Sequence, residues 1–245
     1  MAPRYGQAGL DLNLGSGIRL DGMDITTNDA ETAATPKSTD APASQDSPAS
    51  PDSRAPLKLA VILGSNRHGR FGPVVSDWFV SRAAGRADFT VELIDLADTD
   101  LPTALSFRPT AQVRDQLAGI THRLAEADAF VVVTPEYNHS YPASLKALID
   151  WHFHEWQAKP VGFVSYGGIS GGLRAVEHLR QVFAELHAVS VRDTVSFHNA
   201  GALFDDEGRH RDPDGAEAAA AAMLDQIAWW GLALRDAKSA RAYAG

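Results

Sequence analysis

Apolar positions follow two alternating patterns from residue 57 onward. Apolar runs indicate strands, at 57–63, 89–96, 129–134, 160–166 and 188–197. The last run is the most polar of the five, which is typical of an edge strand. Between the runs, apolar residues recur every three or four positions, as on one face of a helix; examples are Val113, Leu117, Ile120 and Leu124. Strands that alternate with helices predict an α/β fold with a parallel sheet covered on both faces, because right-handed crossovers connect parallel strands.

The first 55 residues have a different composition from the rest of the chain. They are rich in Ala, Ser, Thr, Asp and Pro and hold few large apolar side chains. Such a segment buries too little apolar surface to offset the entropy lost on ordering, so we predict a disordered tail over 1–55 and one folded domain over 56–240. A short apolar patch in the tail is either a docking segment or a frayed extension; it consists of Leu10, Leu12, Leu14 and Ile18.

Charge and cysteine content exclude several classes of function. The chain has 22 Lys and Arg against 31 Asp and Glu, so it lacks the basic excess that binds nucleic acid. No apolar run approaches the roughly 18 residues of a membrane-spanning helix, and the N-terminus does not resemble a secretory signal, which makes the cytoplasm the expected location. Because the chain has no cysteine, any redox chemistry has to come from a bound cofactor.

The loop after the first predicted strand has the composition of a phosphate site. In such sheets, ligands bind beyond the carboxyl ends of the strands. The stretch GSNRHGRFGP offers the hydroxyl of Ser65, the amide of Asn66 and the charges of Arg67 and Arg70, a set suited to a phosphate monoester. It is neither a Walker A loop nor G-x-G-x-x-G. The plainer interpretation is a glycine-rich turn with two solvated arginines.

Two more loops at the same predicted edge are unusual. The stretch SYGGISGGLRAVEHLR, 165–180, has four glycines within six positions, which form either a flat surface for a ring system or a flexible connection. The stretch TPEYNHSYPASLKALIDW, 134–151, follows the third strand. Backbone amides over 136–138 would meet the polar edge of a flat heterocycle, with Tyr137 and Asn138 beside it. Alternatively, Tyr137 is an ordinary surface aromatic.

These three stretches, in this order and spacing, resemble the NADPH-dependent FMN reductase family of flavodoxin-like proteins, which includes quinone, azo-dye and chromate reductases. The likeness covers about residues 57–197, and its most specific part is PEYN followed by P-x-x-L-K-x-x-x-D-W. The resemblance implies a flavodoxin-like three-layer sandwich with a five-stranded parallel sheet in the order 2-1-3-4-5.

The same resemblance implies the cofactor and its site. The loop matching 65–72 would hold the FMN phosphate, and the stretches matching 135–138 and 165–168 would flank the isoalloxazine ring. The residues expected to bind FMN are Ser65, Asn66, Arg67, Arg70, Gly72, Pro135, Glu136, Tyr137, Asn138, Ser165, Tyr166, Gly167 and Gly168. NADPH, or else NADH, would donate hydride, and a quinone, an azo compound or a free flavin would accept it. No catalytic acid, base or nucleophile is expected.

Other interpretations stay open. One alternative is a flavin-binding electron carrier or redox-sensing partner protein without its own nicotinamide turnover; the acidic charge suits docking to a basic partner. Another is a phosphate loop that binds a ligand other than flavin. Basic residues near the cleft, such as Arg108 and Arg174, would favour NADPH over NADH.

Three further expectations concern the segments around these motifs. A helix from Pro142 to Trp156 would present an aromatic face to a partner subunit, and the resemblance points to a homodimer or homotetramer. No metal site is expected, because His152 and His154 would point to opposite sides of that helix. The stretch 198–215 lies outside the family pattern and would cover the site, with Phe204 as the contact, or be exposed to solvent.

Overall fold

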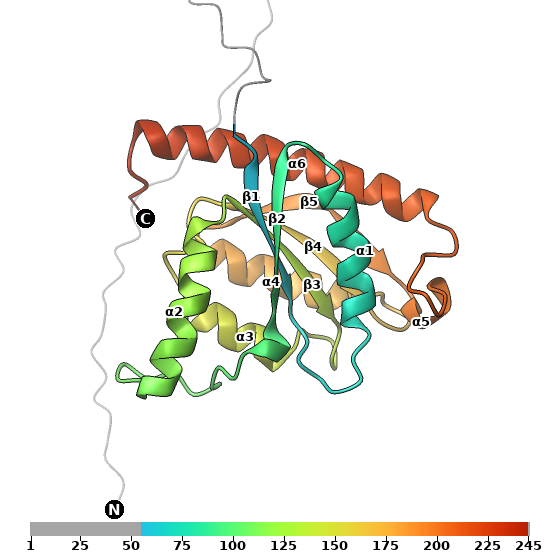
Figure 1. The fold of residues 1–245 in the computed structure, drawn as a ribbon, viewed down its shortest axis with the longest axis horizontal. Coiled ribbons are helices and arrows are strands. Elements are labelled where there is room, and N and C mark those ends of the chain that lie inside the picture. Colours follow the sequence, from blue (N-terminus) through green and yellow to red (C-terminus); the bar gives the residue numbers. More distant parts are fainter. Residues whose placement is uncertain (1–54, 245) are drawn as a thin grey trace, which may run out of the picture. The chain divides into compact units, whose positions relative to one another are not determined.

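The computed structural model of the protein describes residues 55–244, so the predicted tail lies outside the described residues except for its last position. Figure 1 shows the arrangement of the elements. In chain order they are β1 (Leu57–Leu63), α1 (Gly72–Ala84), β2 (Phe89–Asp95), the 3₁₀ turn η2 (Leu96–Asp98), α2 (Ala111–Glu126), β3 (Ala129–Pro135), α3 (Ala143–Asp150), β4 (Pro160–Tyr166), α4 (Leu173–Glu185), β5 (Val189–Phe197), α5 (Ala200–Leu203) and α6 (Asp214–Ala240). All predicted strands are confirmed to within one residue at each end.

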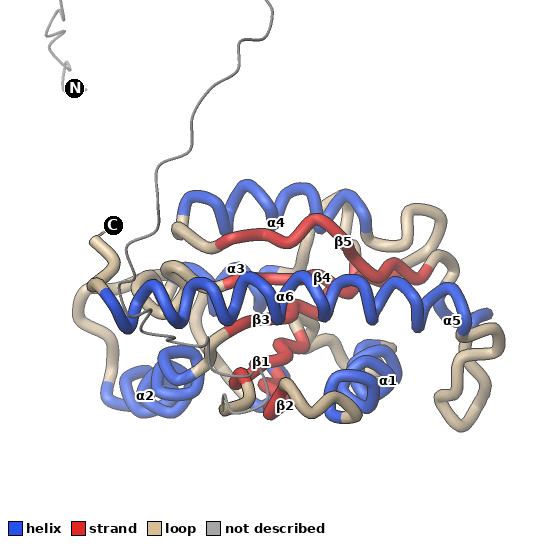
Figure 2. The backbone as a smooth tube through the Cα atoms, turned by 90° about the horizontal axis from the view of Figure 1, so that it is seen from above, coloured by secondary structure: helices blue, strands red, loops and turns tan. Residues whose placement is uncertain are grey.

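The sheet is parallel throughout, with the strand order β2-β1-β3-β4-β5. Strands β3 and β4 are buried along their whole length, because helices cover both faces, whereas the edge strands β2 and β5 mix buried and accessible positions. In Figures 1 and 2, α1 and α2 lie on opposite sides of β1 and β2. This three-layer arrangement confirms the flavodoxin-like fold class. In the described part of the chain, no helix is both long enough and apolar enough to cross a bilayer.

Each face of the sheet packs against its own apolar cluster. On one face, the side chains of α1 and α6 pack on β1, β3, β4 and β5 through residues such as Phe79, Met223 and Ile227. On the other face, α2, α3 and α4 pack on the sheet through residues such as Leu148 and Phe183. Burial of these side chains contributes roughly 1.5–3 kcal/mol each, so the two clusters fix the strand ends from which the loops extend.

Helix α3 is shorter than predicted. It ends at Asp150, and the chain then turns instead of continuing as a helix to residue 156. Trp156 is drawn into the core, where its ring lies 4.8 Å from Phe130 and 5.4 Å from Phe183, measured between centroids. Trp151 donates its indole N–H to the Pro102 carbonyl at 2.8 Å. The expected aromatic face of a helix from Pro142 to Trp156 is therefore wrong, because burial of Trp156 overrides local helical periodicity.

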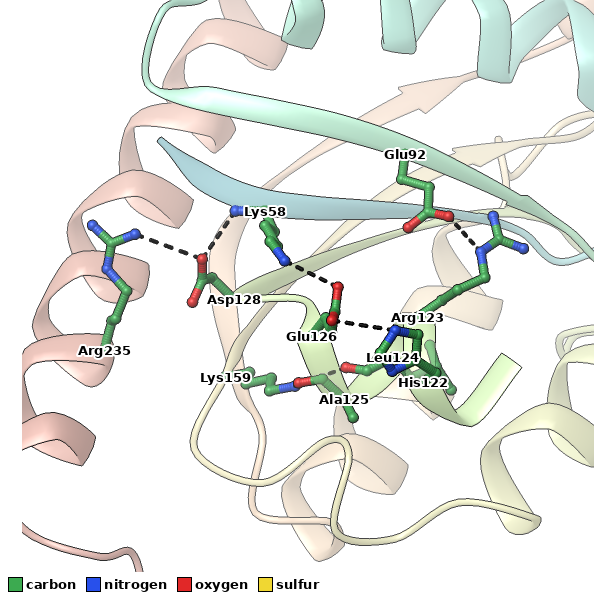
Figure 3. Close-up of polar contacts among 10 residues, drawn as sticks. All are labelled: Lys58, Glu92, His122, Arg123, Leu124, Ala125, Glu126, Asp128, Lys159 and Arg235. Atoms are coloured by element: carbon green, nitrogen blue, oxygen red, sulfur yellow. Dashed lines mark hydrogen bonds and ion pairs between the residues drawn. The ribbon is translucent and has the colours of Figure 1, made fainter. Parts of the chain in front are cut away.

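A polar network holds the opposite edge of the sheet, at the amino ends of the strands (Figure 3). The carboxylate of Asp128 accepts a hydrogen bond from the Lys58 backbone N–H at 2.9 Å. The ammonium of Lys159 donates to the carbonyls of Leu124 and Ala125 at 2.7 and 2.9 Å, in the last turn of α2. Terminal carbonyls of a helix lack intrahelical donors, so a buried cation caps α2 here. This edge is the far end of the sheet from the candidate site.

Candidate functional site

The three loops singled out in the sequence meet at the carboxyl edge of the sheet, because β1, β3 and β4 are neighbours. The hydroxyls of Ser65 and Tyr137 lie 2.7 Å apart, which joins the loop after β1 to the loop after β3. A Cβ atom on Gly167 would lie 3.9 Å from the Cβ of Glu136, which places the loop after β4 beside the loop after β3. The predicted convergence of these loops is thus observed in this structure.

The amino end of α1 is open to an anion. The residue before the helix, Phe71, makes no side-chain cap, and no acidic residue lies in the first turn. Gly72 begins the helix, and a Cβ there would lie 2.6 Å from Leu63 Cδ1 and 2.7 Å from the Tyr166 hydroxyl. Pro73 has no N–H, and the Val74 N–H already donates to the Phe71 carbonyl at 3.2 Å, so the Gly72 N–H and the helix dipole are what favour negative charge at this end.

The hydroxyl of Tyr166 is an unpaired donor at this helix end. Its side chain is 5% exposed, and the Oη atom has no hydrogen-bond partner within residues 55–244. Burial, reinforced by the neighbouring Tyr137, raises the pKa of Tyr166 well above its ordinary value, so the phenol stays neutral and able to donate. A buried donor without a partner costs about 1–3 kcal/mol, and an acceptor oxygen at the start of α1 would remove that cost. This donor set fits a phosphate group.

Arg70 does not have the free guanidinium that the sequence suggested. It forms a two-pronged ion pair with Asp95, with both N···O distances at 2.5 Å, and donates to the Ser65 carbonyl at 2.6 Å. The bond to Asp95 raises the pKa of Arg70, although burial acts against it. Arg70 therefore fastens the loop to the end of β2. Asp95 was missed in the sequence, although its place at the end of a predicted strand puts it at this edge.

Arg67 is the exposed cation of the loop. Its guanidinium carbon lies 5.8 Å from the centre of the Tyr137 ring, and its backbone N–H points to the Ser65 hydroxyl at 3.4 Å. Asn66 beside it is also exposed. These two side chains remain accessible to a ligand, whereas Ser65 is fully buried.

The loop after β3 is a tight two-residue turn. Tyr137 and Ser140 exchange backbone hydrogen bonds at 2.8 and 3.0 Å, and Asn138 and His139 between them have the positive φ angles of 50° and 68°. This is the pattern of a type I′ turn, in which Asn is favoured at the first central position. The Tyr137 N–H is thus used inside the turn, so the expectation that it meets a heterocycle is wrong.

Glu136 ties this turn to α4. Its carboxylate lies 2.9 Å from the Arg174 guanidinium and accepts the backbone N–H of the same residue at 3.2 Å. Burial raises the pKa of Glu136, but hydrogen bonds from Ser170 and Arg174 outweigh it and hold the pKa below its ordinary value. An ionised Glu136 therefore occupies the amino end of α4, which leaves α1 as the better place for a ligand's phosphate.

The loop after β4 is rigid at one end and open at the other. Ser165 is buried and donates to the Gly171 carbonyl at 2.8 Å, so it is not available to a ring as proposed from the sequence. Gly172, with φ of 86°, packs so closely that a Cβ would lie 2.7 Å from Ser165 Cβ. At Gly168, in contrast, a Cβ would meet no atom within 4 Å. Gly168 is therefore the open position of the loop, and Gly167, where a Cβ would lie 3.4 Å from the Gly172 nitrogen, lies next to it.

In the stretch 198–215, Phe204 packs into the core beside the start of α1. Phe204 is 3% exposed, and its ring centre lies 5.7 Å from Phe71, 5.2 Å from Phe197 and 5.0 Å from His210. Phe204 therefore neither covers the site nor faces solvent. It packs behind the residue that precedes α1, which helps to fix the amino end of that helix.

The histidines considered as metal ligands lie in turns after α3. Both ring nitrogens of His152 are engaged, with Leu148 O at 2.8 Å and Thr121 Oγ1 at 3.0 Å. Burial lowers the pKa of His152, so the ring is neutral and part of the core. The helical spacing used to separate His152 from His154 does not apply here, because α3 has already ended.

The sequence model of the NADPH-dependent FMN reductase family matches residues 57–202, more than half of the chain. The chain belongs to this family. All three loops of the site lie within the matched range, and the family implies FMN as cofactor and NAD(P)H as co-substrate.

Named proteins from several organisms resemble the chain in sequence or in fold. An NAD(P)H-dependent FMN reductase of Schizosaccharomyces pombe is 38% identical over 122 residues, which are 47% of this chain and 60% of that protein. A quinone reductase of Escherichia coli is 32% identical over 142 residues, 54% of this chain and 72% of that protein. The solved structure of the Paracoccus denitrificans flavoenzyme NAD(P)H:(acceptor) oxidoreductase shares the fold, with a TM-score of 0.56 at 20% identity over 71% of this chain and 97% of that one.

Proposed function

We propose that the protein is an FMN-dependent NAD(P)H oxidoreductase that passes hydride from NADPH to a quinone, an azo compound or a free flavin. Family membership supports this function, as do relatives named FMN reductase and quinone reductase. The observation that carries it is the unpaired, buried hydroxyl of Tyr166 beside Gly72, at an uncapped helix end. A phosphate oxygen placed there would accept from the phenol and from the Gly72 N–H together.

In this proposal, the loop 65–72 and Tyr166 hold the phosphate of FMN. The Gly72 N–H, the dipole of α1 and the Arg67 guanidinium would meet its charge. Arg70 acts indirectly, because its ion pair with Asp95 keeps the loop in position. Loss of Arg70 would therefore loosen the loop, whereas loss of Arg67 would remove a ligand contact.

The ring of the cofactor would lie beside Tyr137 and the open backbone at Gly167 and Gly168. A flat strip without side chains leaves one face of such a ring accessible to a second flat molecule. Bound FMN would supply the redox chemistry, taking a hydride from a nicotinamide and passing it to an acceptor. Since this face carries few side chains, we expect a wide range of quinones and azo compounds to be accepted.

The proposed donor is NADPH rather than NADH. Of the arginines near the site, Arg70 is paired with Asp95 and Arg174 with Glu136. Arg108 is exposed and has no part in holding the FMN phosphate, so it would meet the additional phosphate of NADPH. Stopped-flow reduction of the bound flavin by each nucleotide tests this choice, and faster reduction by NADH would contradict it.

Steady-state turnover separates the enzyme from an electron carrier. The full-length protein loaded with FMN should oxidise NADPH continuously when a quinone, a free flavin or an azo dye is present. A flavin that NADPH reduces slowly, but that a protein partner reoxidises, would indicate the carrier. A purified protein that takes up phosphate compounds but no FMN would reject both functions.

We also propose that the protein forms a homodimer or homotetramer in the cytoplasm. Exposed apolar side chains remain near the site edge, including Phe107 and Ile169. The outer edge of β5 is less suitable for pairing, because Arg180 donates to the carbonyls of Val191 and Arg192 at 2.7 and 2.8 Å. Association through helices and loops is therefore favoured over an extended sheet. A monomer by light scattering at micromolar concentration would contradict the assembly.

A further inference from the structure

The segment after β5 is joined by a short ladder to the glycine loop of the site. The Gly167 N–H donates to the Phe197 carbonyl at 3.1 Å, and the Asn199 N–H donates to the Gly168 carbonyl at 2.9 Å. The Ala200 N–H then donates to the Gly167 carbonyl at 3.1 Å. His198 lies in the middle of this ladder, so its position is fixed relative to the open strip at 167–168.

The imidazole of His198 is held by two contacts. Its Nδ1 atom lies 3.0 Å from the Ile169 carbonyl oxygen, and because a carbonyl only accepts, Nδ1 carries a hydrogen. The ring rests against Gly171, where a Cβ would lie 2.7 Å from His198 Cδ2 and 2.8 Å from Nε2. Gly171 also has φ of 60°, so a side chain there would be strained as well as displaced by the ring.

The other nitrogen is free to exchange a proton. Nε2 of His198 has no hydrogen-bond partner among residues 55–244, and the residue is exposed to solvent. With Nδ1–H committed to Ile169, the second proton of the imidazolium is held at Nε2 alone. Such a ring can give up one proton without rotating and recover it from water.

We propose that His198 donates the proton that accompanies hydride transfer to a quinone. This inference rests on the proposed function, since it assumes that the acceptor lies on the strip at Gly167 and Gly168. A quinone becomes a hydroquinone by taking up a hydride and one proton. The hydride, which reduced FMN would supply on being oxidised, bonds to one quinone oxygen; the displaced π electrons move through the ring to the other oxygen, and that oxygen takes the proton from Nε2. His198 is left neutral and is protonated again from solvent.

Three other titratable groups at this edge are less suitable. Glu136 is held ionised by Arg174, and Tyr166 is buried with its pKa raised, so neither delivers a proton to an exposed acceptor near neutral pH. His178 contacts the Ser140 hydroxyl, which both donates and accepts, so its protonated nitrogen is not fixed. Within the described chain, His198 combines a fixed tautomer, exposure and a position hydrogen-bonded through its neighbours to the glycine loop.

The test replaces His198 in the full-length, FMN-loaded protein with Asn or Ala. His198→Asn keeps an N–H in the place of Nδ1–H, and so the bond to Ile169, but removes the Nε2 proton; His198→Ala removes both. Flavin reduced by NADPH is reoxidised in a stopped-flow instrument by a benzoquinone or by ferricyanide, which takes electrons without a proton. His122→Asn, on the exposed surface of α2, is the matched control.

The expected result is a split between the two acceptors. His198→Asn and His198→Ala should slow reoxidation by the benzoquinone about 100-fold, the lower end of general acid contributions, and leave reoxidation by ferricyanide unchanged. Wild-type rates with the benzoquinone in His198→Asn would overturn the proposal, and so would equal slowing with both acceptors, since that indicates a structural role. If NADPH fails to reduce the wild-type flavin, the proposed function fails separately, and reduction by dithionite still allows the same comparison.

Discussion

Arg67 and Arg70 lie three positions apart in one loop but have different partners. Arg70 is fixed by Asp95 and the Ser65 carbonyl, whereas Arg67 is exposed beside the Tyr137 ring. The difference was invisible in the sequence, because the partner of Arg70 is 25 residues away on another strand. The local composition predicted that the loop after β1 is positively charged. Only the packing of β2 beside β1 shows that Arg70, and not Arg67, is already paired.

The two arginines should respond differently to substitution. Arg67→Ala removes a charge-assisted contact to the phosphate and should raise the Kd for FMN about tenfold, which is about 1.4 kcal/mol. Arg70→Ala should lower the free energy of unfolding of the FMN-free protein, because it leaves Asp95 unpaired. Fluorescence titration with FMN and urea unfolding measure the two effects. Arg192→Ala, at the β5 edge, is the control, and unchanged FMN affinity in Arg67→Ala would contradict the phosphate assignment.

Tyr166→Phe isolates the unpaired hydroxyl. In the FMN-free protein the substitution removes a buried donor that has no partner, so the free energy of unfolding should stay the same or rise. FMN binding should weaken about tenfold, because the phosphate loses that donor. The control is Tyr243→Phe, which removes an exposed hydroxyl beside His187. A loss of stability in the FMN-free protein, with no change in FMN affinity, would show that the hydroxyl serves the core.

The elements of the fold follow from the sequence more directly than their ends do. Strand bounds were predicted closely, since continuous apolar runs between polar turns mark a buried parallel sheet. The C-terminal end of α3 was not predicted closely. The helical spacing over 145–151 contains no signal that Trp156 packs into the core next to Phe130. The type I′ turn at Asn138 and His139 was also missed, because the second central position of such a turn usually holds Gly and here holds His.

At the start of α1, the close fit of Gly72 should make a single methyl group costly. Gly72→Ala places a Cβ 2.6 Å from Leu63 and 2.7 Å from the Tyr166 hydroxyl, and should lower the free energy of unfolding by about 1–3 kcal/mol. Gly119→Ala, in the middle of α2 with no atom within 4 Å of the new Cβ, should instead raise it by up to about 1 kcal/mol. Urea unfolding compares the two variants; equal effects would mean that the contact at Gly72 relaxes freely.

The cap of α2 should make stability depend on pH. Burial, followed by the charge of Lys238, lowers the pKa of Lys159 from 10.5 to about 8. The unfolded chain keeps this proton up to pH 10.5, so between these values it binds more protons than the folded chain, and the contribution of Lys159 to stability rises with pH. Below about pH 8 the cost of burying the ammonium is fully present.

Comparison with Lys159→Met tests the direction. Between pH 7 and 10.5, the difference in free energy of unfolding should move in favour of the wild type by up to about 3 kcal/mol. Lys58→Met, which replaces an exposed lysine of the same network, is the matched control (Figure 3). If the difference in free energy of unfolding between the wild type and Lys159→Met stays constant over this range, the pKa of Lys159 is not lowered. The hydrogen bonds to the carbonyls of Leu124 and Ala125 would then offset the effect of burial.

At the scale of the whole molecule, every residue assigned to the site lies between Ser65 and His198, within the range that the family matches. Nothing in this assignment requires the first 55 residues. The described fold begins beside α6, where Arg235 donates to the Ala55 carbonyl at 2.9 Å.

A chain that starts at Ser53 should therefore bind FMN and oxidise NADPH at the rate of the full chain. This start keeps the contact between Arg235 and Ala55. Absorbance of the bound flavin and the steady-state rate with a quinone are the measurements. A truncated protein that is folded by circular dichroism but colourless would assign the N-terminal segment a part in cofactor binding.

During protein synthesis, the segments that form the site are made in the order of the sequence. The loop after β1 leaves the ribosome first, yet the glycine loop after β4 is held by Asn199 and Ala200, which follow β5. A nascent chain that ends before these residues has every predicted cofactor contact but not the backbone that fixes Gly167 and Gly168. Flavin binding therefore requires the completed domain. Free FMN in the cell would stabilise completed chains by mass action but would not stabilise chains that are still being synthesised.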